Sequence, residues 1–234
     1  MEIYALGAFL IIVLIYSIII HELAHAVTAL WLGDRTAKDA GRITLDPLPN
    51  IDPVGSILLP IGLIMLQAGF IFGWAKPVPF NPLNLIWQRW GPVVVAIAGP
   101  ITNFLLALIA AIIAMMIPLD EASKVAIAQE FRSSMIFGDL VGLVAGSLSA
   151  IFYAICLMVI YWNVILGLFN LLPIPPLDGS KILFAIFPID IKIRMFLERW
   201  GFFMVIGLFF FTPLGILWSQ IILKGIDIFF ALSL

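Results

Sequence analysis

Long apolar stretches, separated by short polar or proline-rich stretches, run along the whole chain. A helix needs about 20 apolar residues to cross a bilayer, and the runs at 3–32, 92–117 and 140–172 are each long enough. The pattern predicts an all-α polytopic membrane protein, a helical bundle of about 4–6 membrane segments. We expect residues 1–234 to form a single membrane-embedded domain, because no polar stretch is long enough for an appended soluble domain.

Two further apolar runs are interrupted. The run at 54–74 contains Pro60 and several glycines, so we expect a re-entrant segment or a tight hairpin that makes no net crossing. The run at 200–234 is interrupted at Thr212-Pro213, and this predicts one broken span or a tight helical pair.

A polar stretch follows the first apolar run, which is expected to end at Gly33. Within it, Gly41–Leu45 alternates between apolar and polar residues, so it is either a short extended, strand-like segment or plain loop. If it is a strand, its exposed edge is a candidate site for an extended substrate, which would pair with it as an added strand.

The first apolar run carries the pattern H-E-x-x-H in its last third, at His21, Glu22 and His25. Residues four apart lie on one face of a helix, so the two imidazoles can bind one metal ion. Glu22 lies beside them and can take a proton from a metal-bound water. These are the only histidines in the chain. Catalytic zinc usually has three protein ligands and a water, so a third ligand must come from elsewhere.

Asp178 is the best candidate for the third ligand. It follows the proline-broken end of the 140–172 run, and a carboxylate at such a place is tolerated at membrane depth where it lines a cavity or binds an ion. The alternative is a helix cap, because Asp is favoured at the first position of a helix.

Asn103 is a polar amide within the 92–117 run, in Gly99-Pro100-Ile101-Thr102-Asn103. It either joins helices by hydrogen bonds or serves as a hydrogen-bonding group near the site.

The composition is 63% hydrophobic and 11% charged, far from that of soluble domains. The chain has no basic tract, so we expect no nucleic-acid partner. Cys156, the single cysteine, lies in an apolar run and is expected to pack there. The first run lacks a basic n-region and is expected to be retained.

Three motifs resemble one family when taken in order. They are His21-Glu22-Leu23-Ala24-His25, Gly99-Pro100-Ile101-Thr102-Asn103 and the run from Asn170 through Pro173-Ile174-Pro175-Pro176 to Leu177-Asp178-Gly179. Together they resemble the site-2 protease family of intramembrane zinc metalloproteases, peptidase family M50. Gly73-Trp74-Ala75-Lys76-Pro77-Val78-Pro79 is similar to its compact prokaryotic members, which lack PDZ and CBS domains.

This resemblance implies one Zn²⁺ per chain, held by His21, His25 and Asp178, with Glu22 as the catalytic base. It also implies that Asn103 and Asn170 help to hold the substrate strand or the oxyanion. The implied activity is hydrolysis of peptide bonds within or next to transmembrane segments of membrane proteins, in regulated intramembrane proteolysis. One departure is visible: the compact members often have His before I-D-P, where this chain has Asn50.

The distribution of basic residues predicts the orientation. If His25 and Asp178 meet, loops 33–53, 73–90 and 173–199 share one side of the membrane, opposite the connector at 118–139. Most of the lysines and arginines lie in those three loops, while the connector carries only Lys124 and Arg132. The positive-inside rule then places the active site toward the cytoplasmic side of the cell membrane.

Other functions fit the chain less well. A catalytically inactive membrane adaptor of the same fold would have no need of Glu22. A metal-binding or transport protein would need several ionisable groups along a path through the membrane, and the predicted spans show no second cluster. A serine protease has no histidine left for its base, and an aspartyl protease has no partner for Asp178. We therefore expect a metalloendopeptidase whose partners are a transmembrane substrate and the lipid bilayer.

Overall fold

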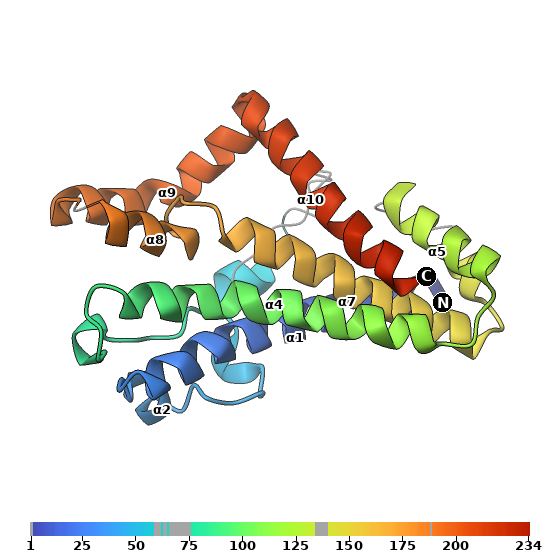
Figure 1. Cartoon of the computed structure of the whole chain (residues 1–234), viewed down its shortest axis with the longest axis horizontal. Helices are drawn as coiled ribbons and strands as arrows, with labels where there is room; N and C mark the ends of the chain where they lie inside the picture. The colour runs from blue at the N-terminus through green and yellow to red at the C-terminus, as the bar shows by residue number, and fades with distance from the viewer. Residues whose placement is uncertain (1, 59–61, 63–64, 66–75, 134–139, 188) are drawn as a thin grey trace. The chain divides into compact units, whose positions relative to one another are not determined.

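The computed structural model of the protein describes residues 2–58, 62, 65, 76–133, 140–187 and 189–234. Every regular element within these residues is helical (Figure 1), which confirms the all-α prediction. The elements are α1 (Glu2–Trp31), α2 (Thr36–Asp39), η1 (Leu48–Asn50), η2 (Pro53–Leu58), η3 (Pro82–Asn84), α4 (Gly91–Met116), α5 (Glu121–Ser133), α6 (Leu140–Val144), α7 (Leu148–Asn170), α8 (Gly179–Ile186), α9 (Ile191–Phe211) and α10 (Pro213–Ser233).

Four helices of the described residues are long and apolar enough to cross a membrane. They are the Phe9–Trp31 part of α1, together with α4, α7 and α10. The number agrees with the predicted 4–6 segments, and the protein is a multi-pass membrane protein.

Residue contacts divide the chain into two compact units. The first contains Met1–Ser17 and Pro100–Leu234, and the second contains Ile18–Gly99. The prediction of a single functional domain over 1–234 stays a prediction, and each unit is described by itself below.

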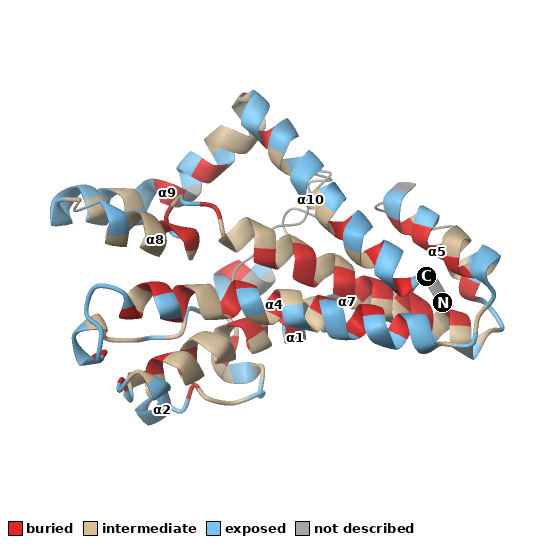
Figure 2. Ribbon diagram, viewed as in Figure 1, coloured by how far each residue is buried: buried red, intermediate tan, exposed pale blue. Residues whose placement is uncertain are grey.

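The core of the first unit is built around α7. Its side chains Tyr153, Leu157, Ile160 and Val164 are fully buried at helical spacing, as the red positions along α7 show (Figure 2). Small residues of α4 enter the same core, namely Ala107, Ala110, Ala111 and Ala114. Small side chains allow membrane helices to approach closely. The core is therefore one of large residues on α7 and small residues on α4.

The helix α7 begins later than its apolar run. The predicted helix over 140–172 is divided into α6 and α7 by Gly146, whose φ of 77° is the left-handed conformation. Ser147 then caps α7 by accepting a hydrogen bond from the Ala150 N–H at 3.2 Å. Average hydropathy does not reveal this break, because Gly146 and Ser147 lie within a run that is apolar overall.

The tail forms a helical pair, one of the two forms predicted for 200–234. Helices α9 and α10 meet at Thr212-Pro213 (Figure 1) and contact each other. Pro213 has no N–H to continue α9, and it takes the first position of α10, where none is needed. Thr212 caps α10 by accepting from the Leu214 N–H.

In the second unit, α1 ends where the sequence predicted. Gly33 has a φ of +103°, and the Asp34 N–H reaches back to the Ala29 carbonyl at 2.9 Å, a common end for a helix. The Asp34 carboxylate is fully buried and accepts hydrogen bonds from Thr36, Asn81 and Asn84. Burial alone would raise its pKa, but the hydrogen bonds outweigh burial and lower the pKa below the ordinary value.

Of the two alternatives for Gly41–Leu45, the strand is wrong: this segment has no regular structure. Gly41 adopts a left-handed φ of 67°, and its N–H closes α2 on the Lys38 carbonyl. The Arg42 N–H is also used to close α2, on the Ala37 carbonyl. A strand edge needs free backbone groups to pair with a neighbouring strand. Because these two N–H groups are already bonded within the chain, Gly41–Leu45 does not offer an edge for a substrate strand. The predicted re-entrant segment at 54–74 lies mostly outside the described residues.

Candidate metal centre

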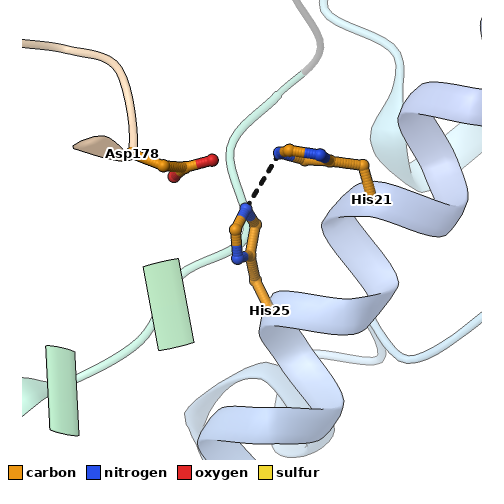
Figure 3. Close-up of side chains that lie close together, drawn as sticks. All are labelled: His21, His25 and Asp178. Carbon is orange, nitrogen blue, oxygen red and sulfur yellow. Dashed lines mark hydrogen bonds between the residues drawn. The ribbon is translucent and has the colours of Figure 1, made fainter. Parts of the chain in front are cut away.

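Two histidine rings project from α1 toward each other. The Nε2 atoms of His21 and His25 lie 3.0 Å apart (Figure 3), as the spacing of one helical turn allows. His21 is buried and His25 is half-buried. Two nitrogen ligands of one tetrahedral zinc, each 2.0–2.1 Å from it, stand about 3.3 Å apart. The two rings are therefore close enough to be candidate ligands of one ion.

The backbone of α4 fixes the proton of His25. Its Nδ1 lies 2.7 Å from the Val95 carbonyl oxygen, which can only accept, so Nδ1 carries the hydrogen and donates it. The lone pair of Nε2 then points toward His21. A hydrogen bond from the second ring nitrogen is the usual way in which proteins orient a metal-binding histidine.

Gly99 explains how the two rings fit against α4. A Cβ at this position would lie 2.5 Å from Cε1 of both His21 and His25. Only glycine leaves room for both rings at such a close approach. The glycine of the Gly99-Pro100 motif therefore makes space for the two histidines.

Glu22 accepts a backbone hydrogen bond. Its Oε2 lies 3.1 Å from the amide nitrogen of Val78, which stands between Pro77 and Pro79. The carboxylate is half-buried. The hydrogen bond from Val78 therefore fixes the orientation of the Glu22 carboxylate.

Asp178 lies in a loop with close backbone contacts on both sides. A Cβ on Gly179 would collide with the carbonyl oxygens of Leu171 and Leu172 at the end of α7, and a Cβ on Gly201 of α9 would collide with the Pro175 carbonyl. Asp178 takes the position before α8, but its side chain makes no capping hydrogen bond. The alternative interpretation as a helix cap is therefore not supported.

His21, His25 and Asp178 form a group of candidate metal ligands. Their ligand atoms all lie within 4.8 Å of one another (Figure 3). Two imidazole nitrogens and one carboxylate oxygen match the donor sets of catalytic zinc sites. This is the one group of at least three His, Cys, Asp or Glu ligands found among the described residues.

Comparison with known proteins decides the family. The sequence profile of "Peptidase family M50" matches residues 76–210, more than half of the chain. The chain belongs to peptidase family M50.

Two relatives agree with this assignment. "Putative zinc metalloprotease YwhC" of Bacillus subtilis (strain 168) is 37% identical over 220 residues, which cover 93% of this chain and 87% of the relative. "Putative zinc metalloprotease Rip2" of Mycolicibacterium smegmatis is 26% identical over 205 residues, 86% of this chain and 67% of the relative. No solved structure matches at comparable significance. The predicted resemblance is confirmed, and so is the prediction of a metalloprotease, at the level of the M50 family.

Asn103 joins helices in this M50 protein. It is fully buried, and its Nδ2 donates to Asn163 Oδ1 of α7 at 2.7 Å. The Nδ2 of Asn163 in turn donates to Ser17 Oγ of α1 at 2.8 Å. Asn170 donates to the Leu166 carbonyl one turn earlier on its own helix. The helix-joining alternative for Asn103 thus has direct support, and substrate binding by Asn103 and Asn170 stays a prediction.

The sequence did not predict the groups that contact His25, Glu22 and Asn103. The Val95 carbonyl and the Val78 amide act through the backbone, so no side-chain pattern could reveal them. Asn163 is a polar residue within an apolar run, which is the same signal that identifies Asn103. It could therefore have been predicted from the sequence.

Proposed function

We propose that the protein is a zinc-dependent endopeptidase that cuts peptide bonds within or next to transmembrane segments of membrane proteins. One observation carries the proposal: the H-E-x-x-H histidines converge on a helix that is itself apolar enough to span the bilayer. His25 lies six residues before the end of α1 at Trp31, roughly 9 Å along a helix with a rise of 1.5 Å per residue. The chemistry would therefore take place inside the hydrocarbon region, where only membrane-embedded substrates reach.

His21, His25 and Asp178 would hold the zinc, whose chemistry is to polarise the scissile carbonyl and to acidify water toward a pKa of ~7. Glu22 takes a proton from the attacking water as the water oxygen bonds to the carbonyl carbon. The same carboxyl group then gives this proton to the leaving nitrogen as the C–N bond breaks. The proton taken from water thus ends on the leaving amine, and Glu22 is again a carboxylate at the end of the reaction.

The proposed active site faces the cytoplasm. The loops on the side of Gly33 and of Asp178 carry most of the basic residues, while the connector between α4 and α7 is net acidic. Cytoplasmic loops are the ones enriched in Lys and Arg. A cytoplasmic orientation would bring water and product release to the same side as the metal ligands.

A reconstituted cleavage assay tests the proposal. The probe is a reporter with one transmembrane helix and a fluorescent protein at its cytoplasmic end, placed in liposomes with the enzyme. We expect the wild type to cut within or next to the helix. Glu22→Gln should lose about 100-fold or more of the rate, the range for a missing general base, while keeping its zinc.

The matched control is Glu121→Gln on α5, an exposed glutamate that should leave the rate unchanged. Cleavage that survives Glu22→Gln would contradict the proposed chemistry. A wild type that binds transmembrane reporters but never cuts them would instead favour the adaptor.

A further inference from the structure

The segment Lys76–Asn81, called here the proline segment, belongs to the second unit and contacts Glu22. It has no helical structure before η3 begins at Pro82. Pro77 and Pro79 hold the residues before them in extended conformations and offer no N–H of their own. Val78 is therefore the single backbone donor from Pro77 to Pro79, and it donates to Glu22 Oε2 at 3.1 Å.

The beginning of the proline segment is anchored by Arg42 and Asn50. Arg42 Nη2 donates to the Lys76 carbonyl at 2.6 Å and to Asn50 Oδ1 at 3.0 Å. The Lys76 N–H donates to the Asn50 carbonyl at 2.9 Å. Both Arg42 and Asn50 are buried, so the bond between their side chains is shielded from water.

The end of the proline segment is anchored by Asp34. This carboxylate accepts from the Asn81 N–H at 2.7 Å and from Asn84 Nδ2 at 2.8 Å. Asp34 lies three residues after the end of α1, the helix that carries Glu22. The segment is therefore tied down on both sides of the one amide that meets Glu22.

We propose that Arg42, Asn50 and Asp34 are positioning residues that hold the proline segment so that the Val78 N–H orients the Glu22 carboxylate for proton transfer. The inference rests on the proposed function, in which Glu22 is the base. A glutamate side chain has several rotamers, and a donor on Oε2 selects one and leaves Oε1 for water. A base held in place before the reaction begins needs no reorganisation during it.

The first experiment tests the contact without any substrate. Protein labelled with ¹³C-carbonyl proline and ¹⁵N-valine gives correlated amide signals only from Pro-Val pairs, which are Pro53-Val54, Pro77-Val78 and Pro92-Val93. The Val78 signal is assigned by Val78→Ala, and its hydrogen exchange is measured by NMR in detergent. We expect exchange at Val78 to be about tenfold faster in Glu22→Ala than in the wild type, which corresponds to about 1.4 kcal/mol.

Two comparisons make this result specific. Exchange at Val93 should not change, and Glu121→Ala, the same substitution at an exposed site, should leave Val78 as in the wild type. Equal exchange at Val78 in the wild type and in Glu22→Ala would overturn the inference.

The second experiment removes only the donor. Replacing the Val78 amide by an ester, through incorporation of the α-hydroxy analogue of valine, keeps the side chain and deletes the N–H. With the single-helix reporter in liposomes, we expect kcat to fall about tenfold with KM and zinc content unchanged. Glu121→Gln, at an exposed site on α5, should retain the wild-type kcat.

The outcomes separate the two proposals. An ester variant as fast as the wild type, while Glu22→Gln is inactive, would overturn the positioning role and leave the protease intact. A faster ester variant would also overturn it, because the segment would then be an inhibitory strap. A wild type that cuts no reporter would count against the proposed function itself. For the anchors, Arg42→Met should lower kcat and Arg42→Lys, which keeps one donor for the Lys76 carbonyl, should restore part of it.

Discussion

Replacing Gly99 by alanine should weaken metal binding without unfolding the helix that carries it. Inside a helix such as α4, Gly→Ala by itself is favourable by about 0.8–1.0 kcal/mol. The new Cβ would nevertheless lie 2.5 Å from Cε1 of His21 and of His25, where ordinary contact begins at 3.4 Å. Both rings, or the α4 backbone that carries the new Cβ, must therefore move by about 0.9 Å.

That displacement is large on the scale of a metal site, where ligand distances hold to about 0.2 Å. Overpacking of this kind costs about 1–3 kcal/mol. We therefore expect the zinc affinity of Gly99→Ala to fall by about 10- to 100-fold, similar to the loss of a group that orients a ligand. The assay is competition for zinc between the purified protein and a chelator of known affinity.

A matched control is available in the same chain. Gly207 of α9 has no atom within 4 Å of an added Cβ, so Gly207→Ala should bind zinc as the wild type does. If Gly99→Ala also keeps the wild-type affinity, the two rings are not held against α4 as described.

Three further predictions concern stability and pH. Asn163→Leu leaves the buried amide of Asn103 without its partner on α7 and should lower the free energy of unfolding by about 1–3 kcal/mol; Asn103→Leu in the same chain should reverse part of this loss in a double-mutant cycle. Because the folded pKa of Asp34 is lowered from 3.8, its ionised form stabilises the protein above that pH and this stability is lost as the pH falls below it. The difference in thermal unfolding between wild type and Asp34→Asn should therefore shrink below about pH 4, and a constant difference would contradict it. Gly179→Ala should destabilise the protein in a chemical-unfolding assay, because its Cβ would collide with the Leu171 carbonyl.

The membrane helices were predictable because their signal is local. Each of α4, α7 and α10 lies within one apolar run. The helix ends at Gly33 and Thr212-Pro213 were predictable because glycine and proline have strong backbone preferences. The ligand pair was equally local, since His21 and His25 lie one turn apart on one helix.

The remainder depends on contacts between distant residues. Asn103 gave no sign that its partner would be Asn163, sixty residues away. The break at Gly146 lies in a run whose average hydropathy is high, and alternation over five residues could not decide between strand and loop at Gly41–Leu45. The Val78 amide that meets Glu22 could not be predicted, because backbone groups are the same at every position.

The most direct test of the proposed three-ligand metal site is the zinc content of the purified protein, measured by elemental analysis for the wild type, His25→Ala and Asp178→Ala. Circular dichroism on the same samples checks that the variants keep their helices. We predict about one zinc per wild-type chain, as a single three-ligand site requires, and none in either variant. Zinc retained at the wild-type level in a folded Asp178→Ala protein would contradict this prediction, because the third ligand would then lie elsewhere in the chain.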